Sequence, residues 1–217
     1  MSAQHQAAAA SAAANQAFAD EYVTASPAAA AARAAATERG ADPVSPAAAA
    51  TLTFLARVIN ARHVVEVGTG TGVSAVALLE GMTSDGVLTS IDNEAELQLV
   101  AREVLNDAGI PRPRARLIAG EALVVLPKLT DTAYDLVFVD GDPLEYVEYV
   151  AQASRLLRPG GLLVLHHALW QGMVADPENS DDEPLIVREA LDAVHELDEF
   201  TAALLPVGDG LLVAVKG

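Results

Sequence analysis

A glycine-rich segment, Glu66-Val-Gly68-Thr-Gly70-Thr-Gly72, combines residue types that suit the binding of a small ligand. It follows a valine-rich run and precedes a helical pattern, so we expect a loop between a strand and a helix. Glycine lets the backbone approach a ligand without interference from a side chain. The spacing is G-x-G-x-G, whereas dinucleotide-binding loops have G-x-G-x-x-G with a pyrophosphate at the helix start. The carboxylate of Glu66 favours a ligand with a positive or hydrogen-donating end instead.

A second acidic residue, Asp92, stands twenty residues after Gly72, at the end of the next apolar segment. A carboxylate at the carboxyl end of a strand beside the glycine loop can accept hydrogen bonds from both hydroxyls of a ribose. The loop and Asp92 together predict a site for a nucleoside with a cationic or amino-acid extension. The alternative is a tight strand-to-helix turn near an unrelated carboxylate.

The elements that must position these residues follow a regular alternation. We expect strands at 63–67, 87–91, 115–118, 135–139, 161–165, 201–207 and 211–215, and helices at 73–80, 94–108, 120–128, 144–156 and about 184–196. Apolar strands separated by helices predict an α/β fold with a mostly parallel sheet and helices on both faces. The turn sequence Gly208-Asp209-Gly210 predicts a final hairpin, and hence one antiparallel edge strand.

Two helices should precede this sheet. Ser26-Pro27 and Ser45-Pro46 are helix-start signals, and the predicted helices run to about Gly40 and Asn60. Residues 1–18 form an alanine-rich tail that we expect to be disordered or loosely helical. The predicted division is this tail, then one domain at 19–217, with N-terminal helices at 19–60 and the sheet core at 61–217.

The composition excludes several classes of function. The net charge of −17 disfavours binding to nucleic acid or to an anionic membrane surface. The chain has no cysteine, which excludes disulfides, thiolate metal sites and cysteine nucleophiles and fits a cytoplasmic location. No apolar run approaches the roughly 18–20 residues that a membrane-spanning helix needs.

Several segments together resemble class I S-adenosylmethionine-dependent methyltransferases, and in particular the bacterial branch of the catechol and caffeoyl-CoA O-methyltransferase family. They are Val44-Ser45-Pro46, VVEVGTGTGVSA at 64–75, LTSIDNE at 88–94, YDLVFVDGDPLEY at 134–146 and LRPGGLLVLHHALWQG at 157–172. The resemblance covers about residues 20–217. It implies a Rossmann-like fold with a seven-stranded sheet, S-adenosyl-L-methionine as cofactor, and a homodimer.

The resemblance also implies which residues bind the cofactor. Glu66, Ser74 and the loop backbone would hold its amino-acid half, Asp92 its ribose, and the segment after the third strand its adenine. The full set is Val44, Glu66, Gly68, Thr69, Gly70, Gly72, Ser74, Asp92, Asn93, Gly120, Glu121, Ala122, Asp140 and Asp142.

At the catalytic end the chain departs from the family pattern. The family commonly uses a divalent metal held by an Asp after the fourth strand and an Asp-Asn pair after the fifth, with a nearby Lys as base. Asp140 matches the first ligand, but His166-His167 replace the Asp-Asn pair and Pro143 replaces the Lys.

Three interpretations of Asp140, His166 and His167 remain open at this point. They could bind a softer divalent ion such as Zn or Mn, since imidazole suits these better than Mg. One histidine could be the general base without any metal. The pair could also be purely structural.

The sequence therefore predicts an O-methyltransferase that acts on a hydroxyl of a small aromatic acceptor, such as a catechol or phenol. Trp170 could line the acceptor pocket or simply pack, and residues 168–183 are the candidate for a mobile acceptor loop. Two other classes compete with this prediction: a non-catalytic protein that binds S-adenosyl compounds, and a nicotinamide-dependent oxidoreductase.

Overall fold

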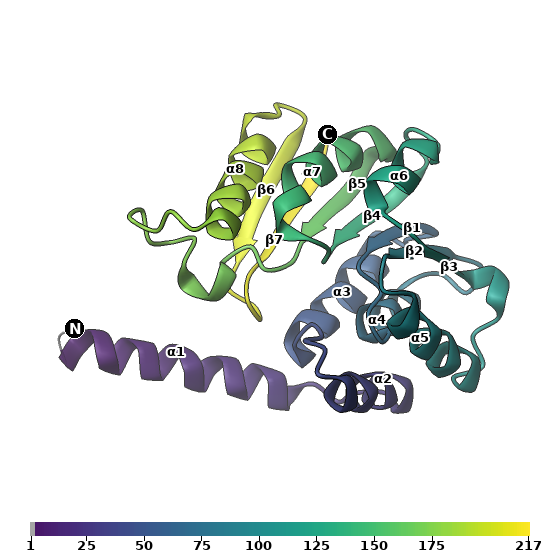
Figure 1. Cartoon of the computed structure of the whole chain (residues 1–217), viewed down its shortest axis with the longest axis horizontal. Helices are drawn as coiled ribbons and strands as arrows, with labels where there is room; N and C mark the ends of the chain where they lie inside the picture. Colours follow the sequence, from purple (N-terminus) through teal and green to yellow (C-terminus); the bar gives the residue numbers. More distant parts are fainter. Residues whose placement is uncertain (1–2) are drawn as a thin grey trace.

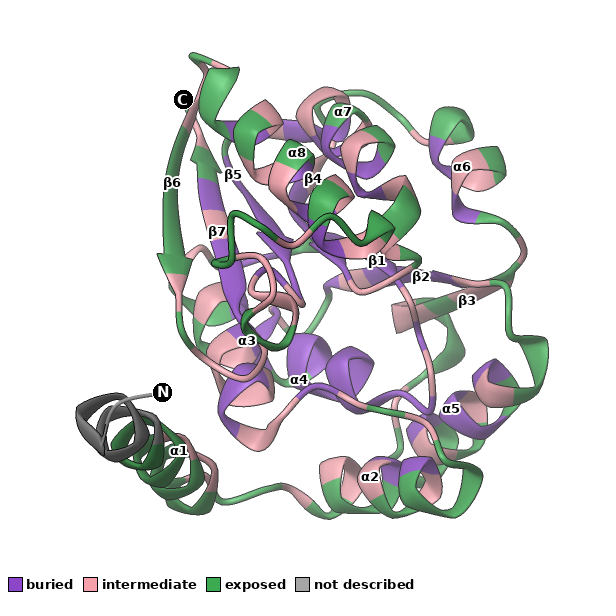
Figure 2. Ribbon diagram, turned by 60° about the vertical axis from the view of Figure 1, so that its left-hand side comes forward, coloured by how far each residue is buried: buried purple, intermediate pink, exposed green. Residues whose placement is uncertain are grey.

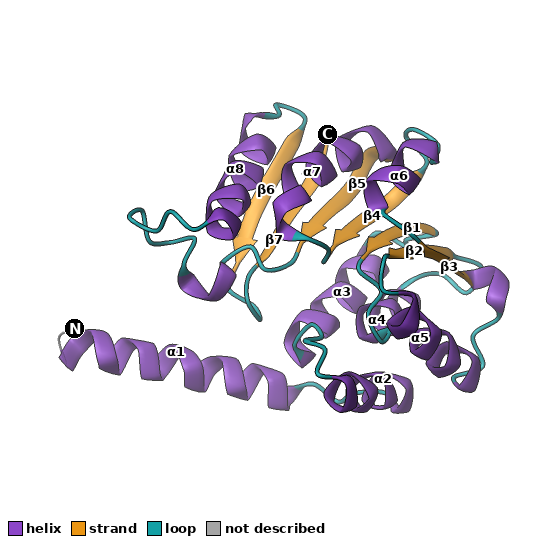
Figure 3. Ribbon diagram, viewed as in Figure 1, coloured by secondary structure: helices purple, strands orange, loops and turns teal. Residues whose placement is uncertain are grey.

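The computed structural model describes residues 3–217, which form one sheet with helices on both sides (Figure 3). The helices are α1 Ala3–Tyr22, α2 Pro27–Arg39, α3 Pro46–Val58, α4 Val73–Gly81, α5 Ala95–Asp107, α6 Ala122–Val125, α7 Tyr146–Leu156 and α8 Asp182–Glu196. The strands are β1 His63–Val67, β2 Val87–Asp92, β3 Ala115–Ala119, β4 Tyr134–Val139, β5 Leu157–Leu165, β6 Phe200–Leu205 and β7 Leu211–Lys216.

The sheet has seven strands in the order β3-β2-β1-β4-β5-β7-β6. Strands β1 to β5 are parallel, as their valine- and leucine-rich sequences and intervening helices predict. The predicted final hairpin is confirmed: β7 runs antiparallel to both β5 and β6. The reversed strand β7 lies one place in from the edge, because the hairpin folds back and places β6 outside it.

Helices cover both faces of the sheet (Figure 1). One hydrophobic core lies between the sheet and α2, α3, α4 and α5, and the other between the sheet and α6, α7 and α8. Burial is concentrated in the inner strands β1, β2, β4, β5 and β7 and in helix α4, whereas the edge strands β3 and β6 have no buried residue (Figure 2). Both cores are mainly aliphatic, and only a few aromatic side chains such as Phe138 and Tyr146 are fully buried.

Several element boundaries differ from the prediction, and β6 for example ends at Leu205 instead of residue 207. The helix expected at 120–128 is the short α6 followed by a 3-10 helix at Leu126–Lys128, because Pro127 lacks the N–H that a longer α-helix needs. A 3-10 helix at Pro143–Glu145, capped by the side chain of Asp142, precedes α7. Strand β5 begins at Leu157, four residues before the predicted start, and the glycines within it accompany a register shift opposite β4.

The N-terminal segment is helical in the structure. Residues 3–22 form helix α1, which includes most of the tail at 1–18 that the sequence predicted to be disordered or loosely helical; Met1 and Ser2 lie outside the described residues. Alanine has the highest helix propensity, which accounts for a helix without a strong apolar face. Helix α1 projects from the body of the molecule (Figure 1). Within the described part of the chain, no helix combines the length and apolar character that crossing a membrane requires.

Candidate functional site

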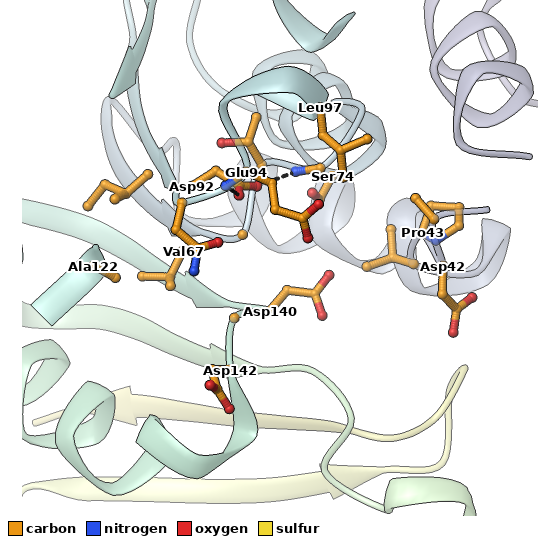
Figure 4. Close-up of a pocket in the computed structure, with 18 of the residues that line it drawn as sticks. Asp42, Pro43, Val67, Ser74, Asp92, Glu94, Leu97, Ala122, Asp140 and Asp142 are labelled. Atoms are coloured by element: carbon orange, nitrogen blue, oxygen red, sulfur yellow. Dashed lines mark hydrogen bonds between the residues drawn. The ribbon is translucent and has the colours of Figure 1, made fainter. Parts of the chain in front are cut away.

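A cavity of about 570 Å³ opens at the carboxyl ends of β1, β2, β4 and β5. This is the edge of an open α/β sheet at which ligands bind, beside the point where the strand order reverses. Figure 4 shows Asp92, Glu94 and Ser74 on one side of this cavity, Asp140 and Asp142 on another, and Asp42 and Pro43 approaching from the loop between α2 and α3.

Backbone hydrogen bonds hold the glycine loop against the end of β2 and the loop after β4. Gly68 donates a backbone hydrogen bond to the Ile91 carbonyl at 2.8 Å, and Asp140 donates one to the Val67 carbonyl at 2.8 Å. Gly68 has φ of 92°, and a Cβ on it would lie 2.1 Å from the Asp140 carbonyl oxygen. Only glycine permits this approach. By contrast, a Cβ on Gly70 would meet no atom within 4 Å, so a ligand can approach the loop closely on this side.

Asp92 extends from the end of β2 into the same cavity. One carboxylate oxygen accepts the Gly70 amide at 2.7 Å, and the other accepts the Glu94 amide at 2.7 Å. These bonds fix the carboxylate and link it to the glycine loop. Each oxygen can accept a further bond, so Asp92 is oriented to receive the two neighbouring hydroxyls of a ribose.

Glu66 is fully buried in β1 and begins a chain of polar contacts. Its Oε2 accepts the Ser90 hydroxyl, which contacts Thr69 Oγ1 at 2.5 Å, and Gln98 Nε2 donates to Thr69 at 3.1 Å. Its Oε1 has no hydrogen-bond partner among the described residues. Burial raises the pKa of Glu66 to about 8, opposed by the hydroxyls of Ser74 and Ser90. Sequence reasoning missed Gln98, since one amide on a helix carries no signal.

The ends of β4 and β5 bring Asp140, His166 and His167 together. Asp140 Oδ1 lies 2.7 Å from His166 Nδ1 and 3.6 Å from His167 Nε2. The two imidazole rings have centroids 4.0 Å apart. Both histidines can face Asp140 because β5 ends at Leu165 and His167 adopts a positive φ of 53°, which breaks the alternation of a strand.

A residue from the final hairpin completes this group. Asp209 Oδ2 lies 2.7 Å from His167 Nδ1, and its other oxygen accepts the Gln171 amide at 2.5 Å. The ring of Trp170 meets that of His167 edge-on, with centroids 5.6 Å apart. Sequence reasoning assigned Asp209 only to a tight turn. Its role was not visible because it lies forty-two residues beyond His167 and meets it only through the β5–β7 pairing.

Negative charge dominates the cavity. Seven carboxylate side chains line it: Asp42, Asp92, Glu94, Glu121, Asp140, Asp142 and Glu145. Within the described lining, Arg39 is the one Lys or Arg side chain. Such a cavity attracts cationic groups and repels anionic ones.

The structure brings most of the predicted site residues to one place. Val44, Gly68, Thr69, Gly70, Ser74, Asp92, Asn93, Gly120, Glu121, Ala122, Asp140 and Asp142 line the cavity, as do His167 and Trp170. Three predicted residues do not line it. Glu66 and His166 are buried behind the lining, and a Cβ on Gly72 would lie 3.1 Å from that of Ala101, so Gly72 serves the packing of α4 against α5.

The donor set does not fit the oxygen-rich metal site that the resemblance implies. One ligand atom from each of Asp140, His166 and His167 lies within 4.8 Å of the others. Two imidazoles and one carboxylate suit Mg²⁺ poorly, because this ion prefers oxygen ligands. The Nδ1 atoms of both rings are paired with carboxylates, so an ion or an acceptor would meet these rings at Nε2.

A mostly parallel sheet in this order, with a glycine loop after β1, an acid after β2 and a cavity between them, defines a Rossmann-like methyltransferase fold. Residues 30–217 match the O-methyltransferase family, so the chain belongs to that family. Its class of activity is therefore methyl transfer to oxygen, and the oxidoreductase alternative is set aside.

Relatives and solved structures agree with this assignment. The chain is 48 % identical over 180 residues to "Probable O-methyltransferase Rv1220c" of Mycobacterium tuberculosis, covering 83 % of this chain and 80 % of that protein. A crystal structure from Corynebacterium glutamicum is similar with a TM-score of 0.86, 30 % identity, and coverage of 92 % and 94 %. The O-methyltransferase TomG of Streptomyces achromogenes, involved in tomaymycin synthesis and solved with S-adenosylmethionine, has a TM-score of 0.83, 29 % identity, and coverage of 92 % and 93 %.

Proposed function

We propose that the protein transfers a methyl group from S-adenosylmethionine to a hydroxyl of a small aromatic acceptor, a catechol or a phenol. The observation that carries this proposal is one cavity with two distinct ends. A ribose-accepting carboxylate, Asp92, and an open glycine lie at one end. A second carboxylate, Asp140, lies at the other end beside the imidazole of His167.

The cofactor fits the residues at the first end. Asp92 would hold the ribose hydroxyls. The buried Oε1 of Glu66 has no hydrogen-bond partner among the described residues, and the ammonium group of the cofactor could donate a hydrogen bond to it. The acidic lining suits a ligand that carries a sulfonium and an ammonium group. When bound, S-adenosylmethionine supplies an electrophilic methyl carbon. The protein's task is to align an acceptor oxygen with it and to remove the hydroxyl proton.

The acceptor end supports a ligand with neighbouring hydroxyl groups. Asp140 Oδ1 and His167 Nε2 are two polar atoms 3.6 Å apart, too far to share a strong direct hydrogen bond. A pair of adjacent hydroxyls could be placed against these two atoms. Trp170 lies beside His167 in the lining and offers an aromatic surface for the acceptor ring.

Calorimetric titration with S-adenosylhomocysteine tests the cofactor half of this proposal. We expect the Asp92→Ala variant to bind more weakly by about 1–3 kcal/mol, because two hydrogen bonds to the ribose would be lost. Asp107→Ala is the matched control, since Asp107 is an exposed carboxylate at the end of α5, outside the cavity lining. Equal affinity in the two variants would show that Asp92 does not bind the ribose.

Transfer of a labelled methyl group to a panel of catechols and phenols tests the acceptor half. Product is expected with at least one catechol. Tight cofactor binding with no product across the panel would favour the competing proposal, a protein that only binds S-adenosyl compounds. One observation supports this second candidate: Pro143, which begins a 3-10 helix, stands in place of the family's lysine.

We also infer that the protein is a homodimer in the cytoplasm. Four large apolar side chains, Phe18 and Tyr22 on α1 and Phe54 and Val58 on α3, are 59–81 % exposed. Exposed apolar side chains on neighbouring helices favour burial against another chain. Sedimentation velocity of the full chain tests this inference, and a monomer at micromolar concentration would contradict it.

A further inference from the structure

We propose that His167, oriented by Asp209, takes the proton from the acceptor hydroxyl, so that deprotonation here depends on an imidazole–carboxylate pair and not on a metal. This proposal rests on the proposed function, because it names the residues that act on the acceptor. Asp209 is thereby a positioning residue that comes from the final hairpin and not from the strand ends that hold the rest of the site.

The contact between His167 and Asp209 is built into the backbone on both sides. Asp209 lies in the turn before β7, where its carbonyl accepts the Leu169 amide at 3.0 Å and the Gly210 carbonyl accepts the Ala168 amide at 3.2 Å. A Cβ on Gly210 would lie 2.7 Å from the Leu169 nitrogen, so the turn and the segment after His167 are closely packed. Both partners of the 2.7 Å contact are therefore held in place.

The contact determines which nitrogen of His167 is free. Asp209 can only accept, so the Nδ1 of a neutral His167 carries the hydrogen and donates it. The lone pair is then on Nε2, in a side chain that is 24 % exposed and lines the cavity. This is the arrangement that a general base needs, with one nitrogen paired with a carboxylate and the other without a hydrogen, beside Asp140 in a side chain of the cavity lining.

His166 does not meet these conditions. Its side chain is only 4 % exposed, it does not line the cavity, and its Nδ1 is occupied by Asp140. Its backbone amide donates to the Val139 carbonyl, and its backbone carbonyl accepts a hydrogen bond from the Tyr146 hydroxyl at 3.1 Å. Its contact instead fixes the carboxylate of Asp140, which would receive a second acceptor hydroxyl.

The chemical step balances with these groups alone. The acceptor hydroxyl passes its proton to His167 Nε2 while its oxygen forms a bond to the methyl carbon. The carbon–sulfur bond breaks and its electron pair stays on sulfur, so the sulfonium charge disappears and an imidazolium charge appears. The charged groups that face this imidazolium are Asp209 from the final turn and Asp140 from the end of β4, and neutral or charged His166 lies alongside. The imidazolium then releases its proton to water.

The test uses 4-nitrocatechol, whose absorbance spectrum distinguishes the phenol from the phenolate, with S-adenosylhomocysteine present. The wild-type protein should bind the probe largely ionised at a pH where the free probe is mostly protonated, and EDTA should not change this. In the His167→Gln and Asp209→Asn variants, the ratio of ionised to neutral bound 4-nitrocatechol should fall at least about tenfold. Asp107→Asn is the control and should behave as wild type.

Three results would overturn the proposal. The first is an ionised band that EDTA abolishes and Mn²⁺ or Zn²⁺ restores, which would assign Asp140 and the histidines to a metal. The second is a band equally strong in both variants. The third comes from NMR of the protein labelled with ¹⁵N-histidine, which needs no acceptor. We expect neutral His167 to carry its hydrogen on Nδ1. A hydrogen on Nε2 instead would exclude His167 as the base. Failure of the proposed function is distinguishable, because it would appear in the wild type as absence of S-adenosylhomocysteine binding or as absence of methyl transfer to every acceptor of the panel, whereas failure of this proposal alone leaves both intact.

Discussion

Glu66 is the residue at which burial and charge oppose each other most directly. Its carboxyl is fully buried and one oxygen has no partner in the described structure, yet it sits beside the glycine loop. Because burial raises its pKa to about 8, the folded protein keeps Glu66 protonated near neutral pH. A side chain of this kind costs stability once it ionises, and that cost is offset when a cation binds next to it.

The raised pKa predicts how stability depends on pH. The folded state holds the Glu66 proton more tightly than the unfolded chain does between pH about 4.5 and pH about 8. The contribution of this residue to the free energy of unfolding therefore falls as pH rises through that window. Glu66→Gln should remove the decline and be more stable than wild type at pH 8, by roughly 1–4 kcal/mol, with little difference at pH 5.

Urea denaturation at several pH values measures this effect. Glu103→Gln on the exposed side of α5 is the control and should leave the pH dependence of wild type intact. Parallel curves for wild type and Glu66→Gln from pH 5 to pH 8 would show that the folded protein does not retain the Glu66 proton.

Residue types alone predicted one end of the site better than the other. Asp92 and the glycine loop were recognisable because both ends of their contact lie in one strand–helix–strand unit, where spacing determines geometry. His166 and His167 were correctly placed beside Asp140, but their roles could not be separated. That distinction depends on Asp209, whose contact with His167 exists only once the hairpin has paired with β5.

At the scale of elements, a close backbone approach joins two of the loops at the sheet edge. The close approach of Gly68 to the Asp140 carbonyl joins the loop after β1 to the loop after β4. These two loops carry the two ends of the cavity. Their separation is therefore set by a residue that has no side chain.

Gly68→Ala should consequently damage both stability and the site. The added Cβ would lie 2.1 Å from a backbone oxygen, and φ of 92° is itself unfavourable for alanine. We expect a loss of about 2–5 kcal/mol in the free energy of unfolding. Gly109→Ala is the matched control: φ is 71° and no atom lies within 4 Å, so only about 1–2 kcal/mol should be lost.

Guanidinium denaturation of the two variants measures this difference, and calorimetry with S-adenosylhomocysteine measures the site. Equal losses of stability would mean that the loop after β4 moves away at little cost.

The elements themselves were predictable because alternating apolar runs, glycines and prolines mark their ends. The position of β7 inside the sheet was not, since hairpin sequence defines pairing with β6 and says nothing about which side meets β5.

At the scale of the whole molecule, the net charge of −17 and the seven carboxylates of the cavity act in the same direction. Acceptors that bear a negative charge, including coenzyme A thioesters with their phosphates, enter such a cavity against an electrostatic barrier. The field therefore favours neutral or cationic acceptors over anionic ones.

Comparison of three acceptors tests this selectivity: catechol, its carboxylate-bearing analogue and its aminoethyl-bearing analogue. We expect kcat/KM for the carboxylate to be at least about tenfold below that for the amine at low salt. The gap should narrow as ionic strength rises, because salt screens the charges that cause it. A preference for the carboxylate, or a gap that salt does not change, would indicate that local contacts determine selectivity.

The place of β7 in the sheet has a consequence for the order of folding. Residues 211–216 pair with β5 on one side and β6 on the other. Until β7 has paired, β5 presents an open apolar edge, which is a site for aggregation. The contact between Asp209 and His167 also forms only when this hairpin has docked. A folding intermediate without the hairpin therefore has the strands around the cofactor cleft in place while His167 lacks its carboxylate partner.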